Sequence, residues 1–326
     1  MKVIQPALVL FILCFVVVFA IVLWASSPNH SPADYSVLIE KELPTAVDED
    51  SVYSIVTYNI GYLSGMTNNL PVIGESSFYD ENLKKALANL KVLNPDIICL
   101  QEIDFNSDRS FQVNQQEAIQ NLGYKYAFQA VNWDEKYLPF PGSPFNFNTH
   151  YGAVYSGQSI ISKYPLKETE RTVLERPESL AFYEEGFYLD RLAQHTTIKI
   201  GGQPVYLINV HLEAFDKAAR TKQMNYLVDW IKEIIEDTPL LLVGDFNSDI
   251  DKATASIHAI ANLPGMAYAT TGSQKESLTF PSDQPVKRLD YIFYNQQYIA
   301  MEEAAVLHEF GTVSDHLPVM LSFRLK

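Results

Sequence analysis

Short apolar runs that each end in a polar residue are the feature that most constrains the fold of this chain. In LLLVGDFNSD, residues 240–249, four aliphatic residues lead into Gly244, and two acidic residues and an amide follow. Such a run bounded by a breaker is typical of a buried strand, and open α/β sheets carry their chemistry at strand ends. Asp245 and Asn247 lie two residues apart, so an extended backbone would project both to one side. Taken alone, the stretch also fits a polar turn after a core strand.

Strand-like runs alternate with helical stretches from residue 52 to the end of the chain. Apolar positions three and four apart predict helices at 79–94, 111–123 and 217–237. Apolar runs predict strands at 52–60, 96–103, 124–133, 157–166, 191–212 (a hairpin turning at Gly201 and Gly202), 240–246, 289–295 and 316–325. Because no internal repeat interrupts this pattern, residues 52–326 are predicted to form one α/β domain of mixed sheets covered by helices.

The N-terminal residues differ from the rest of the chain. No charged or polar residue occurs from Ala7 to Ala25, roughly the length that crosses a hydrocarbon core as a helix. We expect residues 1–25 to be a transmembrane anchor. A cleaved signal peptide is the alternative, but its apolar region is usually shorter, and VLWAS offers a small residue at only one of the two key positions. Residues 26–51 are predicted to be a linker to the domain at 52–326.

Charges around the apolar segment predict its orientation. Lys2 is the only basic residue before it, whereas four acids follow it: Asp34, Glu40, Glu42 and Asp48. By the positive-inside rule, we expect a single-pass membrane protein with a cytoplasmic N-terminus and its domain on the extracytoplasmic side. If the segment is removed, the protein is secreted instead.

The composition disfavours broad affinity for nucleic acid. Lys and Arg total 24 against 39 Asp and Glu, a net charge of −15, and non-specific binding to phosphate backbones depends on basic side chains. A nuclease is not excluded, because a bound metal can reverse the field in an acidic cleft. Cys14 lies in the apolar segment and Cys99 in a predicted core strand, so no disulfide between them is expected and the redox compartment stays open.

Polar groups end several of the predicted strands, in the motifs TYNIG, LQEID, NVHLEA, GDFNSD, LDYIF and SDHLPV. With LQE, GDFN and SDH in this order, the set resembles the endonuclease/exonuclease/phosphatase superfamily, which includes deoxyribonuclease I, neutral sphingomyelinases and deadenylases. The match covers nearly all of residues 52–326. It implies a four-layer α/β sandwich, in which two packed mixed β-sheets are flanked by helices, here preceded by the N-terminal transmembrane helix.

The resemblance also implies roles for the motif residues. Glu102 would ligate an essential divalent metal, Mg²⁺ or Mn²⁺ in its place, and Asp315 would add to metal binding. Asn59 matches an amide that helps hold the metal or the phosphate. Asp245 matches the carboxylate that orients or deprotonates the attacking water, and Asn247 the amide that binds the scissile phosphate.

Two histidines complete the implied site. His211 and His316 would contact the phosphate, and Asp290 would support His316 by fixing its tautomer and raising its basicity. Glu213 and Arg191 either reach this cleft or are surface charges; the sequence leaves both readings open.

The predicted reaction is phosphodiester hydrolysis by in-line attack of an activated water. The stretch from Trp133 to Ser156, rich in proline and aromatic residues, is expected to be a long loop that stacks on bases, inserts into lipid, covers a headgroup or packs on itself. Its single Lys136 and the apolar segment favour an exported phosphodiesterase acting on a membrane lipid headgroup or extracellular nucleic acid. The alternatives are a secreted deoxyribonuclease-like endonuclease and a catalytically silent tethered binding module. No motif indicates a protein partner.

Overall fold

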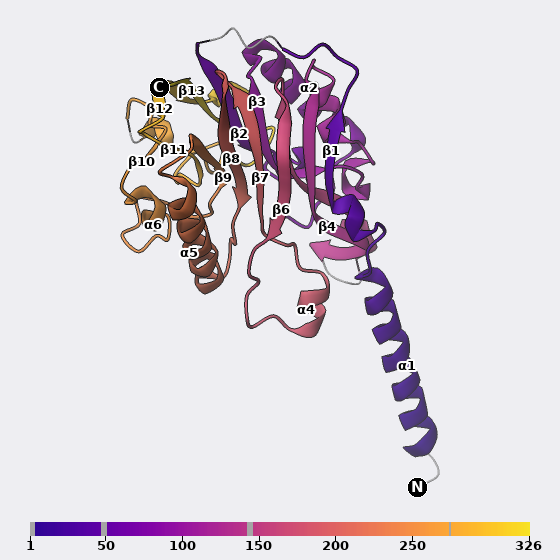
Figure 1. The fold of residues 1–326 in the computed structure, drawn as a ribbon. Helices are drawn as coiled ribbons and strands as arrows, with labels where there is room; N and C mark the ends of the chain where they lie inside the picture. The colour runs from indigo at the N-terminus through magenta and orange to yellow at the C-terminus, as the bar shows by residue number, and fades with distance from the viewer. Residues whose placement is uncertain (1–3, 47–50, 142–145, 274) are drawn as a thin grey trace.

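Two packed β-sheets with helices on their outer faces form the folded domain of the computed structural model, which describes residues 4–46, 51–141, 146–273 and 275–326 (Figure 1). One sheet has seven strands in the order β1-β4-β5-β3-β2-β13-β12, and the other has six in the order β10-β11-β9-β8-β7-β6. Parallel and antiparallel pairs occur in both sheets. The predicted sandwich of two mixed sheets flanked by helices is therefore confirmed.

The elements have the following bounds. The strands of the larger sheet are β1 Ser36–Glu40, β4 Tyr126–Pro141, β5 His150–Ser162, β3 Ile97–Asp104, β2 Tyr53–Asn59, β13 Val319–Leu325 and β12 Ile299–Val306. Those of the smaller sheet are β10 Met266–Tyr268, β11 Asp290–Asn295, β9 Leu240–Asp245, β8 Gln203–His211, β7 Leu192–Ile200 and β6 Leu166–Val173. The helices are α1 Ile4–Ala25, α2 Ser76–Leu93, α3 Gln115–Gln120, α4 Phe182–Gly186, α5 Lys217–Ile234 and α6 His258–Ala261.

Alternation along the strands builds the layers of the core. In β2, Ile55 belongs to the buried cluster between the two sheets, whereas its neighbour Val56 belongs to the cluster under α2. In β9, Leu241 and Leu242 are divided in the same way between the central cluster and the cluster under α5. Because successive side chains of a strand point to opposite faces, a continuous apolar run is what a strand buried on both faces requires.

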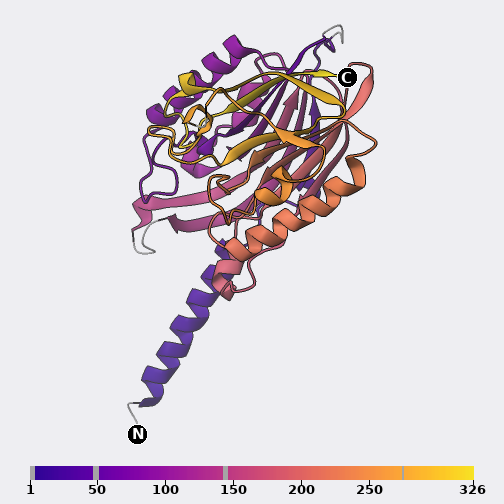
Figure 2. The ribbon, with the colours of Figure 1, turned by 90° about the vertical axis from the view of Figure 1, so that its left-hand side faces the viewer.

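The parallel pairs bring polar strand ends to one end of the sandwich. β2 runs parallel to β3, and β8 runs parallel to β9, where His211 pairs with Asp245. We call the end at which these four strands terminate the site end. α4 precedes β7, whose first residue Leu192 pairs with His211, so α4 lies at this end as well. α1 projects from the same end of the molecule (Figures 1 and 2).

Part of the expected linker at 26–51 is folded onto the domain. Its strand β1 pairs with β4 at the edge of the larger sheet, from Ser36 opposite Ala130 to Glu40 opposite Tyr126. The carboxylate of Asp134 accepts hydrogen bonds from the backbone N–H groups just before β1. A short strand with partly exposed residues carries little apolar signal, so pairing along the β4 edge decides its conformation. Residues 47–50 lie outside the described part of the chain.

The expected loop from Trp133 to Ser156 is instead mostly a β-hairpin, which corrects that prediction. β4 continues to Pro141 and β5 begins at His150, with irregular register on the way. Ser156 pairs with both Asp104, the last residue of β3, and Trp133, so the hairpin extends past the site end. Its prolines and bulges hide the strand period in the sequence. Residues 142–145 at its turn are not described.

One described helix is long and apolar enough to cross a membrane. The segment Leu8–Ala25 has a mean hydropathy of 3.3, and 6% of it is buried. These properties fit a membrane span and a signal sequence equally.

Candidate active site

Side chains from both sheets converge on a cleft at the site end. The cleft has a volume of about 470 Å³, and its walls include Glu102, His211, Asp245, Asp315 and His316. Asn59, buried at the end of β2, connects the two sheets, since its Nδ2 donates to Glu102 Oε1 (3.1 Å) on one side and Asp245 Oδ2 (3.0 Å) on the other. The strand ends thus meet at one point, as their shared position at the sheet edges predicts.

Glu102 and Asp315 form the acidic corner of the cleft. Asn68 Nδ2 donates to Glu102 Oε2 (2.8 Å) and to Asp315 Oδ1 (3.2 Å), so the two carboxylates lie on either side of one amide. Burial and the charge of Asp315 raise the pKa of Glu102. Asn68 Oδ1 is buried without a hydrogen-bond partner among the described residues. Two adjacent carboxylates and an unpaired amide oxygen are a donor set that a hard divalent cation fits.

Asp245 and Asn247 are in contact, but through a turn after β9 and not along the extended backbone that their spacing predicted. The backbone N–H of Asn247 donates to Asp245 Oδ1 (2.8 Å), and burial raises the pKa of Asp245 to about 7 although the charge of His316 opposes this. Asn247 has left the strand conformation, with φ 48°, and its Nδ2 donates to the carbonyl of Leu212 (2.9 Å). That amide is therefore held by the backbone at the end of β8.

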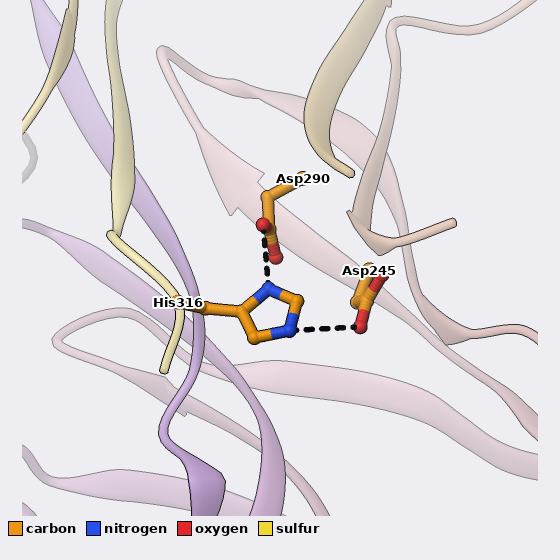
Figure 3. Close-up of side chains that lie close together, drawn as sticks. All are labelled: Asp245, Asp290 and His316. Carbon is orange, nitrogen blue, oxygen red and sulfur yellow. Dashed lines mark hydrogen bonds and ion pairs between the residues drawn. The ribbon is translucent and has the colours of Figure 1, made fainter. Parts of the chain in front are cut away.

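Asp290, His316 and Asp245 form a connected group on the other side of the cleft (Figure 3). Strand register places Asp290 opposite Asp245, while His316 arrives from the loop before β13 in the other sheet. His316 Nδ1 lies 2.9 Å from Asp290 Oδ2, and His316 Nε2 lies 3.8 Å from Asp245 Oδ2. Burial disfavours the imidazolium, but the two carboxylates outweigh it and raise the pKa of His316 well above its usual value.

The same three residues offer ligand atoms within 4.8 Å of one another, a spacing that suits a metal ion. However, the Nδ1 of His316 is at hydrogen-bonding distance from Asp290, which is the geometry of a carboxylate that orients an imidazole. We therefore interpret this group as one that holds a proton, and the corner at Glu102 and Asp315 as the better cation site.

His211 lies between the acidic corner and Asp245. Its Nε2 is 3.6 Å from both Glu102 Oε1 and Asp245 Oδ2, and 2.8 Å from Nη1 of Arg191. Burial, Arg191 and His316 together lower the pKa of His211 well below its usual value, so this imidazole is neutral near pH 7. Arg191 is buried and paired with Glu213 (3.4 Å). Arg191 therefore lines the cleft, whereas Glu213 is neither a cleft wall nor a surface charge but is buried against Arg191.

Some residues of the cleft carry no recognisable signal in the sequence. Asn68 lies in the loop GMTNNL after β2, where nothing in the local pattern separates it from a turn residue. Phe280 lies with its ring centroid 4.9 Å from that of His316, and Lys287 lies over the Phe280 ring at 5.7 Å. Tyr62 and Trp133 also line the cleft. These side chains reach the site only through the tertiary fold.

Comparison with known proteins identifies the family. Residues 56–316 match the Endonuclease/Exonuclease/phosphatase family. The chain belongs to this family. The match begins within β2 and ends on His316, so it includes Glu102, Asp245 and Asp290 of the cleft.

Curated relatives of the family are distant in sequence. The chain is 24% identical to the uncharacterized protein YbhP of Escherichia coli over 237 residues, which cover 72% of this chain and 86% of YbhP. It is also 24% identical to nocturnin of Xenopus laevis over 276 residues, which cover 76% of this chain and 66% of nocturnin.

Solved structures share the fold. The human nocturnin catalytic domain with bound sulfate covers 91% of this chain and all of its own, with a TM-score of 0.59 and 19% identity. A humanized D. rerio TDP2 covers 84% of this chain and all of its own, with a TM-score of 0.57 and 20% identity. Members of the family are divalent-metal-dependent hydrolases of phosphoester bonds, so the chain is of the nuclease or phosphodiesterase type.

Proposed function

We propose that this protein is a membrane-anchored, Mg²⁺-dependent phosphodiesterase that hydrolyses its substrate by in-line attack of water. The observation that carries the proposal is the joining of two unlike groups in one cleft: the acidic corner of Glu102 and Asp315, and the carboxylate of Asp245 with its raised pKa. Asn59 holds both at hydrogen-bonding distance. A charge-neutralising site next to a carboxylate near its pKa is what phosphoryl transfer to water requires.

A divalent ion would bind at the acidic corner. Glu102 and Asp315, with the amide oxygen of Asn68, would hold it, and an oxygen-only donor set suits Mg²⁺, or Mn²⁺ in its place. The bound ion would neutralise charge on the phosphoryl oxygens as a Lewis acid. Asn59 Oδ1 accepts from the backbone N–H of Gly61 (3.1 Å), so we assign Asn59 to bracing the two carboxylates.

The remaining residues would bind the phosphate and activate the water. The Arg191 guanidinium, the His316 imidazolium and the Lys287 ammonium are cationic donors of the cleft, and neutral His211 lies between Glu102 and Asp245. Asp245, in its ionised form, would accept the proton of the attacking water. Asn247 would support Asp245 through its backbone N–H rather than bind the phosphate with its amide.

A lipid headgroup is the substrate class that we favour. The cleft is built from residues at the site end, and α1 projects from that end (Figure 1), so an anchored protein would carry its active site close to the bilayer. By the positive-inside rule the domain lies on the extracytoplasmic side, and cleavage of the apolar segment would instead release a secreted enzyme.

Nucleic acid is the second candidate. It is favoured by similarity to a probable CCR4-Not complex 3'-5'-exoribonuclease subunit Ccr4 of Encephalitozoon cuniculi, at 26% identity over 69% of this chain, although the match spans only 46% of that relative.

The test is hydrolysis by the full-length protein in nanodiscs, with Mg²⁺ or with chelator, on bis(p-nitrophenyl) phosphate, phospholipid vesicles and single-stranded RNA. Asp245→Asn is expected to lower kcat by about 10²- to 10⁴-fold, because it removes the proton acceptor. Glu303→Gln, an exposed substitution on β12, is the matched control and should keep full activity. Absence of Mg²⁺-dependent hydrolysis, with metal binding retained, would support the silent binding module. Lipid and RNA turnover distinguish the two substrate classes.

A further inference from the structure

Exposed aromatic side chains gather at the site end. Among the described residues outside α1, every exposed phenylalanine lies in a segment that extends from this end: the loops after β3 and β8, the β4–β5 hairpin and α4, with Phe111, Phe215, Phe140, Phe147 and Phe182. Tyr183 of α4 is half exposed beside them. Phe215, at 89% exposed, also lines the active-site cleft. A soluble surface rarely concentrates large apolar side chains on one face unless that face meets a partner.

α4 is packed against α1, and this contact identifies the partner of the exposed aromatic face. The Phe182 ring lies with its centroid 6.2 Å from that of Phe19 in α1. At the other end of α4, the backbone of Gly186 lies close to the side chain of Ser26: a Cβ built on Gly186 would be 3.2 Å from it. Phe187 and Ala25 belong to one buried cluster with residues of the β4–β5 hairpin. α1 and α4 therefore form one continuous surface.

The contact with Phe19 fixes the position of α4 along the axis of α1. Phe19 precedes Ala25 by six residues, about 9 Å along the helix axis at 1.5 Å per residue. If Leu8–Ala25 spans the hydrocarbon core, Phe182 reaches about 9 Å below the level of Ala25, within the roughly 5–10 Å to which interfacial segments bury their apolar side chains. The other end of α4, Gly186, lies against Ser26 just beyond the apolar segment, at the headgroup level.

We propose that α4, with Phe182 and Tyr183, is a second membrane contact that binds the surface of the bilayer that α1 spans. This inference rests on the proposed anchoring and adds an orientation to it. The chain leads directly from α4 into the cleft wall at Leu189 and Arg191, and Trp133 Nε1 of the hairpin donates to the carbonyl of Phe187 (3.1 Å). Seating α4 in the bilayer therefore points the cleft at the phosphodiester headgroups of that leaflet.

The first test is spectroscopic and needs no activity. The background is full-length protein with Cys14→Ser, in which the remaining Cys99 is buried in the core. One further cysteine is introduced and labelled with the fluorophore NBD. Each labelled protein is measured in phosphatidylcholine nanodiscs with or without brominated acyl chains. The labelled positions are Tyr183→Cys in α4, Val16→Cys as the probe of the anchor, and Val92→Cys, 88% exposed at the end of α2, as the control in water. We expect blue-shifted, bromine-quenched emission at positions 183 and 16 and neither at position 92.

The outcomes separate the inference from the proposed function. Quenching at position 16 without quenching at 183 overturns the second contact and leaves the anchor. Absence of quenching at all three positions overturns the anchor itself. A blue shift at 183 that depends on protein concentration and not on bromine shows a contact with a second copy of the chain, which also overturns the inference.

A second test asks whether the contact serves catalysis. Phe182→Asp with Tyr183→Asp is compared with Phe182→Leu on phospholipid vesicles and on soluble bis(p-nitrophenyl) phosphate. We expect the acidic pair to lose turnover of the vesicle substrate while the soluble substrate is hydrolysed at the wild-type rate, and Phe182→Leu to keep both. Equal rates on vesicles for all variants would overturn the orienting role. Absence of soluble hydrolysis in the wild type would count against the phosphodiesterase, and the fluorescence result would still decide the contact.

Discussion

At the scale of single residues, the cleft depends on charges that set each other's protonation. Asp290 is fully buried; its Oδ2 lies 2.9 Å from His316 Nδ1, and its Oδ1 has no hydrogen-bond partner among the described residues. A buried carboxylate is costly unless a cation or hydrogen-bond donor compensates it. The pair therefore stabilises the imidazolium form of His316, and that form extends to higher pH than in an isolated histidine.

Replacing Asp290 by Asn is expected to shift the alkaline limb of the kcat/KM profile to lower pH. Loss of the carboxylate lowers the pKa of His316, so its proton is lost at lower pH and phosphate binding weakens. We expect a loss of about a hundredfold above neutral pH and a smaller loss below it. The pH profile with bis(p-nitrophenyl) phosphate measures this. A loss that is uniform across pH would show that Asp290 acts through structure alone, and Glu303→Gln should leave the profile unchanged.

At the scale of elements, Gly244 determines how closely β9 approaches β8. Its φ is 138°, and a Cβ built on it would lie 2.0 Å from the backbone carbonyl oxygen of Val210. Backbone atoms cannot move away as a flexible side chain can, so the two strands pack in this way only around a glycine. This contact sets Asp245, the next residue, against His211.

Gly244→Ala is expected to destabilise the protein by about 3 kcal/mol or more, in the upper range of single substitutions, because strands β8 and β9 must separate. Gly123→Ala is the matched control. Gly123 also has a positive φ, 117°, but a Cβ there meets nothing within 4 Å, so it should cost only about 1–2 kcal/mol of backbone strain. Denaturant unfolding of the two variants measures the difference, and equal costs would contradict the importance of the β8–β9 approach.

At the scale of the whole molecule, the residues between α1 and the sandwich are part of the fold. β1 covers the β4 edge of the larger sheet. Asp134 accepts hydrogen bonds from the backbone N–H groups of Asn29 (3.0 Å) and His30 (2.8 Å) and from the hydroxyl of Tyr35 (3.0 Å). The N-terminal segment therefore ties α1 to the site end rather than letting it move on a free tether.

A fragment that begins at Val52 is expected to be less stable, and more prone to aggregation, than one that begins at Asn29. Without β1 the edge of β4 is unpaired, and an unpaired edge is a template for association with other chains. The buried carboxylate of Asp134 also loses its donors. Thermal unfolding and size-exclusion chromatography of the two fragments test this, and equal melting temperatures would show that β1 adds nothing to the domain.

The sequence predicts the central strands better than it predicts the edges of the two sheets. β9, β11 and the β7–β8 hairpin lie close to their expected ranges, because continuous apolar runs bounded by turn residues leave little ambiguity. The strands that were not expected, β1, β6, β10 and β12, include the edge strands of both sheets. Edge strands are partly exposed, so they carry little of the apolar pattern from which a strand is inferred.

The sequence by itself determined the family and the reaction class, because the motifs LQE, GDFN and SDH occur in the order of a known family. It also determined the strand ends that carry Glu102, Asp245, Asp290 and His316, because each motif combines an apolar run with a polar residue that is costly to bury. Their roles remain predictions. Only the tertiary structure decided that Asn68 stands between the two carboxylates, that Arg191 reaches His211, and that α4 packs on α1. These contacts join residues from different loops and elements, and no local pattern records which loops meet when the strands pair.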